Sequence, residues 1–234
     1  DATISFHAQN VAIPFTNQTP LAYENMELNI TNLYVQPRKS IAYFKAKKIT
    51  LNSITHALQI DGFQMRQRLA ESKYAKHFGW DKAYIKMDIY RATIFGIPHK
   101  LRSLKDGIHL PKIVVLGLQT YLYKDKRLPH PKTLKPFPIE ALSASKIPIH
   151  VDTIKVADSQ LFYNENWRED YIPGRLSLTD INVTITNVSS TGPTKSGNWA
   201  KIKGNILLSN ELELAVDWRF DLRKKGKEFT LDLG

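Results

Sequence analysis

Histidines and carboxylates, the side chains best suited to metal binding or acid–base chemistry, are scattered along this chain of 234 residues. None of the seven histidines has a second histidine four residues away, the spacing that puts two imidazoles on one helix face. His109 and His150 take equivalent places in two similar segments, which indicates neighbouring strand surfaces rather than a site. The sequence therefore predicts no metal and no cofactor.

Three aspartates, Asp152, Asp158 and Asp180, are the best candidates for paired-carboxylate catalysis. Each one adjoins a predicted turn or kink, as solvated carboxylates at strand ends do. The chain has no cysteine, no nucleophile elbow, no zinc-protease motif and no phosphate-binding glycine loop. We predict a non-enzymatic protein, and a hydrolase with a scattered site is the enzymatic alternative.

Apolar and polar residues alternate along most of the chain, which predicts strands with one apolar and one polar face. Residues 209–211 and 223–227 have the composition of hairpin turns, and residues 127–148 contain five prolines and form an extended connector. One short helix is expected near residues 64–80. The fold class is mostly β, with a long, curved, mainly antiparallel sheet that forms an open groove; a closed β-sandwich is the alternative.

Two segments of the chain resemble each other. Gly107–Val115 aligns with Pro148–Val156 at an offset of 149 − 108 = 41 residues. The repeat units cover about residues 105–147 and 148–190, and each is interpreted as a strand pair whose alternation changes parity midway, as at a β-bulge. Residues 1–234 are treated as a single elongated segment of a larger chain.

The net charge of +11 indicates an anionic partner. The basic clusters are short and separate, and no aromatic residues interleave with them as in RNA-binding strands, so no nucleic acid is expected. An anionic membrane surface is the more plausible partner for basic turns. The longest apolar run, residues 113–118, is far too short to span a bilayer.

One family resemblance stands on three stretches of the sequence. These are Leu110–Asp125 (LPKIVVLGLQTYLYKD), Lys146–Glu165 (KIPIHVDTIKVADSQLFYNE) and Pro173–Asn187 (PGRLSLTDINVTITN). Their alternation, with an Ile-x-Val in each stretch, resembles the AsmA-like proteins of Gram-negative bacteria, relatives of TamB and YhdP. The likeness covers residues 105–190 best.

The resemblance implies a repeating β-groove with an apolar concave face that binds phospholipid or another acyl-chain lipid. It also implies phospholipid transport, a contribution to outer-membrane biogenesis and homeostasis, envelope protein partners and no enzymatic activity. It places the protein in the periplasm, tethered to the inner membrane through an N-terminal helix absent from this chain.

The apolar strand faces have two interpretations, because a one-sided sheet needs a second layer over its apolar face. Lipid supplies that layer in a groove, and a second sheet supplies it in a β-sandwich binding module, such as an adhesin or a carbohydrate binder. The groove interpretation predicts the following lining residues: Ile108, Leu110, Ile113, Val115, Ile149, Val151, Ile154, Val156, Leu178, Ile181, Val183, Ile185, Val216 and Trp218.

Overall fold

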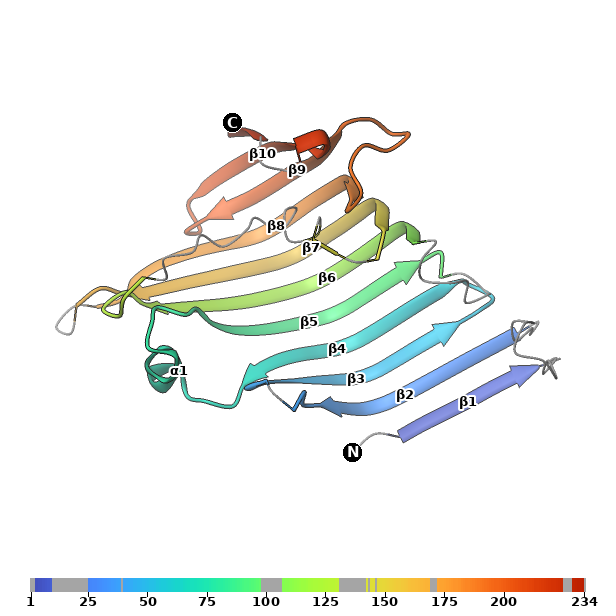
Figure 1. Cartoon of the computed structure of the whole chain (residues 1–234), viewed down its shortest axis with the longest axis horizontal. Coiled ribbons are helices and arrows are strands. Elements are labelled where there is room, and N and C mark those ends of the chain that lie inside the picture. Colours follow the sequence, from blue (N-terminus) through green and yellow to red (C-terminus); the bar gives the residue numbers. More distant parts are fainter. Residues whose placement is uncertain are drawn as a thin grey trace.

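A computed structural model of the chain describes residues 3–9, 25–38, 40–97, 107–130, 142, 144–145, 147–168, 172–224 and 229–233. These residues form one sheet of eleven strands that lie in chain order, so that each strand pairs with the next one in the sequence (Figure 1). The strands are β1 Thr3–Gln9, β2 Asn25–Val35, β3 Ala42–Asn52, β4 Ala57–Gln67, β5 Tyr84–Phe95, β6 Ile108–Asp125, β7 Ile149–Asn166, β8 Gly174–Ser189, β9 Trp199–Leu208, β10 Leu212–Asp221 and β11 Phe229–Leu233.

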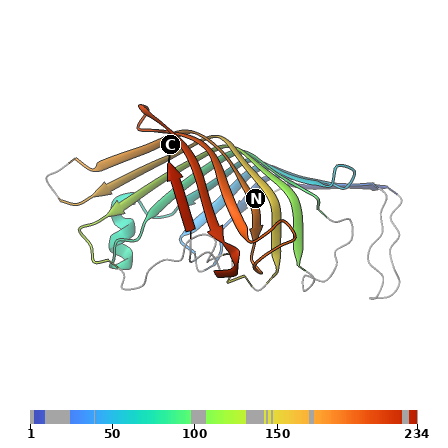
Figure 2. The same ribbon diagram turned by 90° about the horizontal axis from the view of Figure 1, so that it is seen from above.

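The sheet is open, with β1 and β11 at its two edges. Within the described ranges, no strand packs face to face against another, so the closed-sandwich alternative is wrong for this part of the chain. The predicted open, curved and mainly antiparallel sheet is confirmed, and Figure 2 shows its arched profile. The predicted turn at 209–211 joins β9 to β10, whereas residues 225–227 of the second predicted turn lie outside the described residues.

One pair of strands, β6 and β7, is parallel. Ile108 pairs with Ile149 and Gln119 with Gln160, so the register has the same 41-residue offset as the internal repeat. Parallel neighbours need a long crossover, and the proline-rich connector runs between these two strands, with residues 131–141, 143 and 146 outside the described part. Each aligned segment falls almost entirely within one strand of 18 residues, and the second repeat unit, residues 148–190, contains the antiparallel pair β7 and β8.

The long strands bend where the alternation changes parity. Gly117 in β6 and Asp158 in β7 both have left-handed backbones, with φ of 61° and 51°. Asn32 in β2 and Gly62 in β4 also have left-handed backbones, with φ of 55° and 61°. Glycine, asparagine and aspartate are the residue types that adopt this conformation most readily. The predicted mid-strand kink therefore has a local backbone cause.

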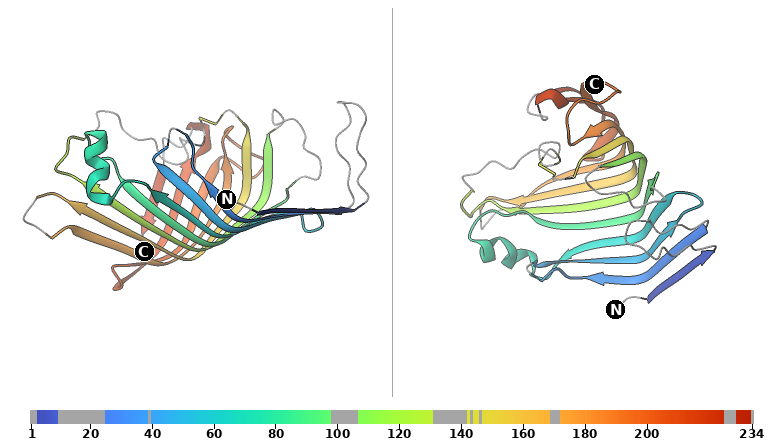
Figure 3. Two further views of the ribbon diagram at one scale, coloured as in Figure 1. Left: turned by 90° about the horizontal axis from the view of Figure 1, so that it is seen from below. Right: turned by 45° about the vertical axis from the view of Figure 1, so that its right-hand side comes forward.

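A small core lies at the β9–β10 end of the sheet. Ala200, Phe220 and Leu222 form it, and Leu142, Val188, Ile202 and Trp218 pack against it. Leu222 belongs to the short 3-10 helix η2, Leu222–Lys224, which folds back over the concave side of the sheet (Figure 3). The strand residues that pack against Leu222 therefore mark the concave face, called the inner face below.

The helix α1 is shorter than predicted and spans Glu71–Phe78. Residues 64–67 belong instead to β4, where Met65 pairs with Met87 of β5. Tyr74 of α1 packs edge-on against Tyr84, with ring centroids 5.4 Å apart. Tyr84 precedes Ile85 and so points away from the face that Ile85 lines. No helix among the described residues is long and apolar enough to cross a membrane.

Candidate functional site

The inner face carries two unbroken rows of apolar residues that run across the strands. In each row, every residue is the register partner of the next. The first row, from β2 to β10, contains Leu28, Leu51, Leu58, Ile94, Ile113, Ile154, Ile185, Ile202 and Trp218. The second contains Ile30, Ile49, Ile60, Ala92, Val115, Val156, Val183, Gly204 and Val216. We call these eighteen residues the apolar ladders.

The positions between the two ladders are polar, apart from Val114, and point to the opposite, outer face. They are Asn29, Thr50, Gln59, Thr93, Val114, Lys155, Thr184, Lys203 and Asp217. Ion pairs on this face tie neighbouring strands together: Lys203 Nζ lies 2.8 Å from Asp217, and Arg91 Nε lies 2.6 Å from Asp61. The sheet is therefore amphipathic across nine strands.

The predicted lining residues fall on the inner face. Eight of the fourteen belong to the apolar ladders. Ile108 pairs with Ile149, and Leu110 pairs with Val151, which in turn pairs with Val188 of the core. Leu178 pairs with Leu161 and Leu208, and Ile181 pairs with Ser159. Leu110 and Val151 are buried, while the other twelve are partly exposed.

The sequence-based list missed the half of the face that lies on β2 to β5. Leu28, Leu51, Leu58 and Ile94 continue the first ladder with no break. On the same half, the rings of Phe44 and Phe63 stack with centroids 6.1 Å apart. The signal that could have found these residues is the alternation itself, which is as regular here as in the repeat.

The apolar ladders are accessible. All eighteen residues are partly exposed and none is buried. Among the described elements, η2 covers the inner face at the β9–β10 end, and α1 packs on the outer side. Nine strands spaced by about 4.8 Å give an apolar strip about 40 Å long. Such a strip suits a long apolar ligand and offers no polar group for catalysis.

Charged residues gather at the end of the sheet where β6 and β7 finish. Asp81 is 1% exposed, and its Oδ2 lies 2.7 Å from His130 Nδ1 and 3.7 Å from the Nζ atoms of Lys124 and Lys126. Burial raises the pKa of Asp81, but the His130 hydrogen bond and the lysine charges outweigh it and leave the pKa below its usual value. At this end of the sheet, basic side chains therefore surround one buried carboxylate.

Beside it, the Tyr163 hydroxyl donates a hydrogen bond of 2.5 Å to Glu165, and Trp167 Nε1 donates one of 2.6 Å to the same carboxylate. Burial, together with the Glu165 carboxylate, raises the pKa of Tyr163 far above its usual value. Tyr163 therefore stays protonated as a hydrogen-bond donor.

The three candidate aspartates do not form the paired-carboxylate arrangement considered from the sequence. Asp158 and Asp180 both occupy left-handed backbone positions at bends, with φ of 51° and 46°. Asp152 instead contacts His109, and its oxygens lie 3.0 Å from His109 Nε2. The structure thus brings His109, His150 and Asp152 together, a juxtaposition that the sequence analysis did not predict.

No protein-family model matches the chain, and no curated protein matches its sequence. The likeness to AsmA-like proteins therefore depends on the sequence stretches quoted above.

Proposed function

We propose that this chain is a non-enzymatic lipid-binding and lipid-transfer module whose inner face shelters the acyl chains of a phospholipid. The observation that supports the proposal is the pair of apolar ladders, continuous over nine strands and partly exposed along their length. A sandwich would bury such a face under a second sheet, and the described residues contain one sheet.

The energy available from such a face is sufficient. Each methylene that leaves water gains about 0.8 kcal/mol, so about fifteen half-covered methylenes gain about 6 kcal/mol. Association costs reduce this gain, but two acyl chains double it. A dedicated head-group pocket is therefore not needed for binding, which explains why a lipid conduit shows no sequence motif.

The wider setting comes from the AsmA-like resemblance alone. On that basis we propose a periplasmic protein, anchored in the inner membrane by a helix outside this chain, that takes part in phospholipid transport and outer-membrane homeostasis. Partners would be phospholipid, an anionic membrane surface and other envelope proteins. Neither nucleic acid nor a cofactor has a place in this proposal.

The test compares two double variants that differ in the face they alter. Val156→Asp with Val183→Asp puts two carboxylates on the inner face, at positions that pair directly between β7 and β8. Thr153→Asp with Thr186→Asp puts the same two charges, also directly paired, on the outer face of the same strands. Each purified protein is mixed with phospholipid vesicles and re-isolated, and bound lipid is measured by native mass spectrometry and extraction.

The wild type and the outer-face variant should carry phospholipid, and the inner-face variant should lose it while keeping its β-sheet circular dichroism. Equal lipid uptake by all three proteins would refute the groove. Unfolding of the inner-face variant alone would indicate that this face is a covered core instead.

A further inference from the structure

Two histidines lie side by side on the outer face because β6 and β7 are parallel. His109 and His150 are register partners, and their rings stack with centroids 4.7 Å apart and planes 11° from parallel. Their chain neighbours Leu110 and Val151 are buried toward the inner face, so alternation directs both imidazoles outward. The cluster is therefore separate from the apolar ladders.

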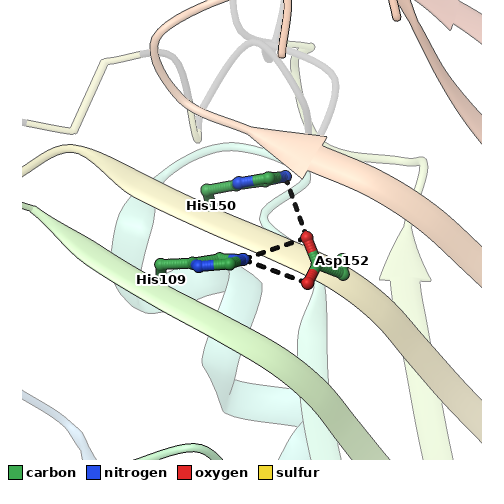
Figure 4. Close-up of side chains that lie close together, drawn as sticks. All are labelled: His109, His150 and Asp152. Carbon is green, nitrogen blue, oxygen red and sulfur yellow. Dashed lines mark hydrogen bonds and ion pairs between the residues drawn. The ribbon is translucent and has the colours of Figure 1, made fainter. Parts of the chain in front are cut away.

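A carboxylate completes the cluster. Asp152 follows His150 by two residues, so its side chain returns to the same side of β7. His109 Nε2 lies 3.0 Å from both oxygens of Asp152, and His150 Nε2 lies 3.3 Å from Oδ1 (Figure 4). The Nε2 atom of His150 is buried and makes no well-formed hydrogen bond, and its contact with Asp152 Oδ1 is a long one of 3.3 Å. Buried polar atoms almost always form a hydrogen bond, so this poorly satisfied nitrogen supports a ligand at this position.

We propose that His109, His150 and Asp152 bind a divalent first-row transition metal ion, with Zn²⁺ as the representative. One atom from each residue lies within 4.8 Å of the others. Two imidazoles and one carboxylate are a typical donor set for such ions, whereas Mg²⁺ and Ca²⁺ prefer oxygen donors throughout. Water would supply the fourth ligand.

The distances fit a tetrahedral ion once the two stacked rings tilt so that one ion lies in the plane of both. Zinc bonds of about 2.0–2.1 Å keep neighbouring ligand atoms about 3.3 Å apart. The nitrogen–oxygen separations of 3.0 and 3.3 Å already match this spacing. The two imidazole nitrogens must approach each other, and His109 can supply that movement because its side chain is 61% exposed. His150, 27% exposed, is the more fixed ligand.

The position of the site gives the ion a structural role. β5 ends at Phe95, opposite Lys112, so the first residues of β6 have β7 as their described neighbour. A metal that binds residues from both strands would fasten this end of the parallel pair. Because the ligands are brought together only in the folded chain, metal binding should stabilise the fold.

The experiment titrates the 234-residue chain with ZnCl₂ by isothermal titration calorimetry and follows thermal unfolding with and without Zn²⁺. We expect one ion per chain and a higher Tm with zinc. His109→Ala and His150→Ala should each weaken binding by about tenfold or more and remove the rise in Tm. His77→Ala, which removes an exposed histidine from α1, should leave both unchanged.

Two further measurements identify the ligands: Zn²⁺ binding by the Asp152→Asn variant, and the visible absorption spectrum of the protein loaded with Co²⁺. The asparagine variant keeps the shape of Asp152 but weakens the site, and Co²⁺ should give visible absorption bands that are lost in the His109→Ala variant. His109 is exposed, so its alanine variant remains folded even if His150→Ala does not. Absence of saturable Zn²⁺ binding, or equal binding by His109→Ala, Asp152→Asn and wild type, would overturn the proposal.

Discussion

Asp81 is a buried carboxylate that connects segments at the ends of neighbouring strands. Its carboxylate contacts His130, Lys124 and Lys126, and its backbone N–H donates to Pro129 O at 3.0 Å. The segment before β5 is thereby fastened to the segment after β6. The basic side chains stabilise the charged form of this buried carboxylate, and the carboxylate in turn supplies counter-charge to Lys124 and Lys126.

Replacing Asp81 by Asn should destabilise the fold by about 1–3 kcal/mol at pH 7, because the hydrogen bond weakens and the lysines lose one of their counter-charges. Urea unfolding of the variant and the wild type measures the difference. An unchanged urea midpoint would show that the contact contributes nothing.

The same residue sets a pH dependence. The pKa of Asp81 is lowered in the folded protein, so the unfolded chain binds more protons than the folded one as the pH falls. The contribution is complete above the ordinary aspartate pKa of 3.8 and is lost as the pH falls through the lower folded value. Unfolding free energies measured from pH 6 downward, to about pH 2, should decline less steeply in Asp81→Asn than in wild type. Parallel acid profiles would contradict this assignment.

At the scale of the element, the bend in β6 depends on Gly117. A Cβ built at this residue would lie 2.9 Å from the Cβ of Tyr90, and the backbone φ of 61° is one that other residues rarely adopt. Gly117→Ala should therefore cost about 1–2 kcal/mol of stability. Gly174, at the start of β8, has its nearest such contact at 3.8 Å and no left-handed backbone, so Gly174→Ala should change stability by less than about 0.5 kcal/mol. Equal losses in chemical denaturation would contradict a special role for the bend.

The strands were predictable because alternation depends on local sequence alone. The pairing of the strands was not predictable in the same way. The apolar alternation changes parity within each of the 18-residue strands β6 and β7, so the sequence of each resembles two short strands. Residues 64–67 have helix-compatible side chains, and their pairing with β3 on one side and β5 on the other makes them a strand. The inner-face residues of the repeat followed from alternation. The His109–His150–Asp152 cluster did not, because it requires knowing that β6 and β7 are parallel neighbours.

At the scale of the whole molecule, apolar and charged residues lie on different faces of the sheet. Apolar residues cover the inner face, while charged side chains occupy the outer face and the strand ends; Lys45, Lys47 and Lys48 on β3 are all exposed. With a net charge of +11, the molecule should be attracted to anionic surfaces over a range set by salt. Apolar contact with acyl chains is not screened in this way, so the two kinds of lipid interaction are separable.

The last prediction uses that difference. The chain should co-sediment with phosphatidylglycerol vesicles and hardly at all with phosphatidylcholine vesicles at low salt, because each basic residue near an anionic surface contributes about 1 kcal/mol. Raising the salt to about 1 M shortens the screening length to about 3 Å and should release the protein from the vesicles. Lipid already sheltered on the inner face should stay bound through the same salt step, as measured by extraction of the released protein. Equal binding to both vesicle types at low salt would show that the charge has no part in membrane contact, and loss of sheltered lipid with salt would show that the inner face binds head groups rather than acyl chains.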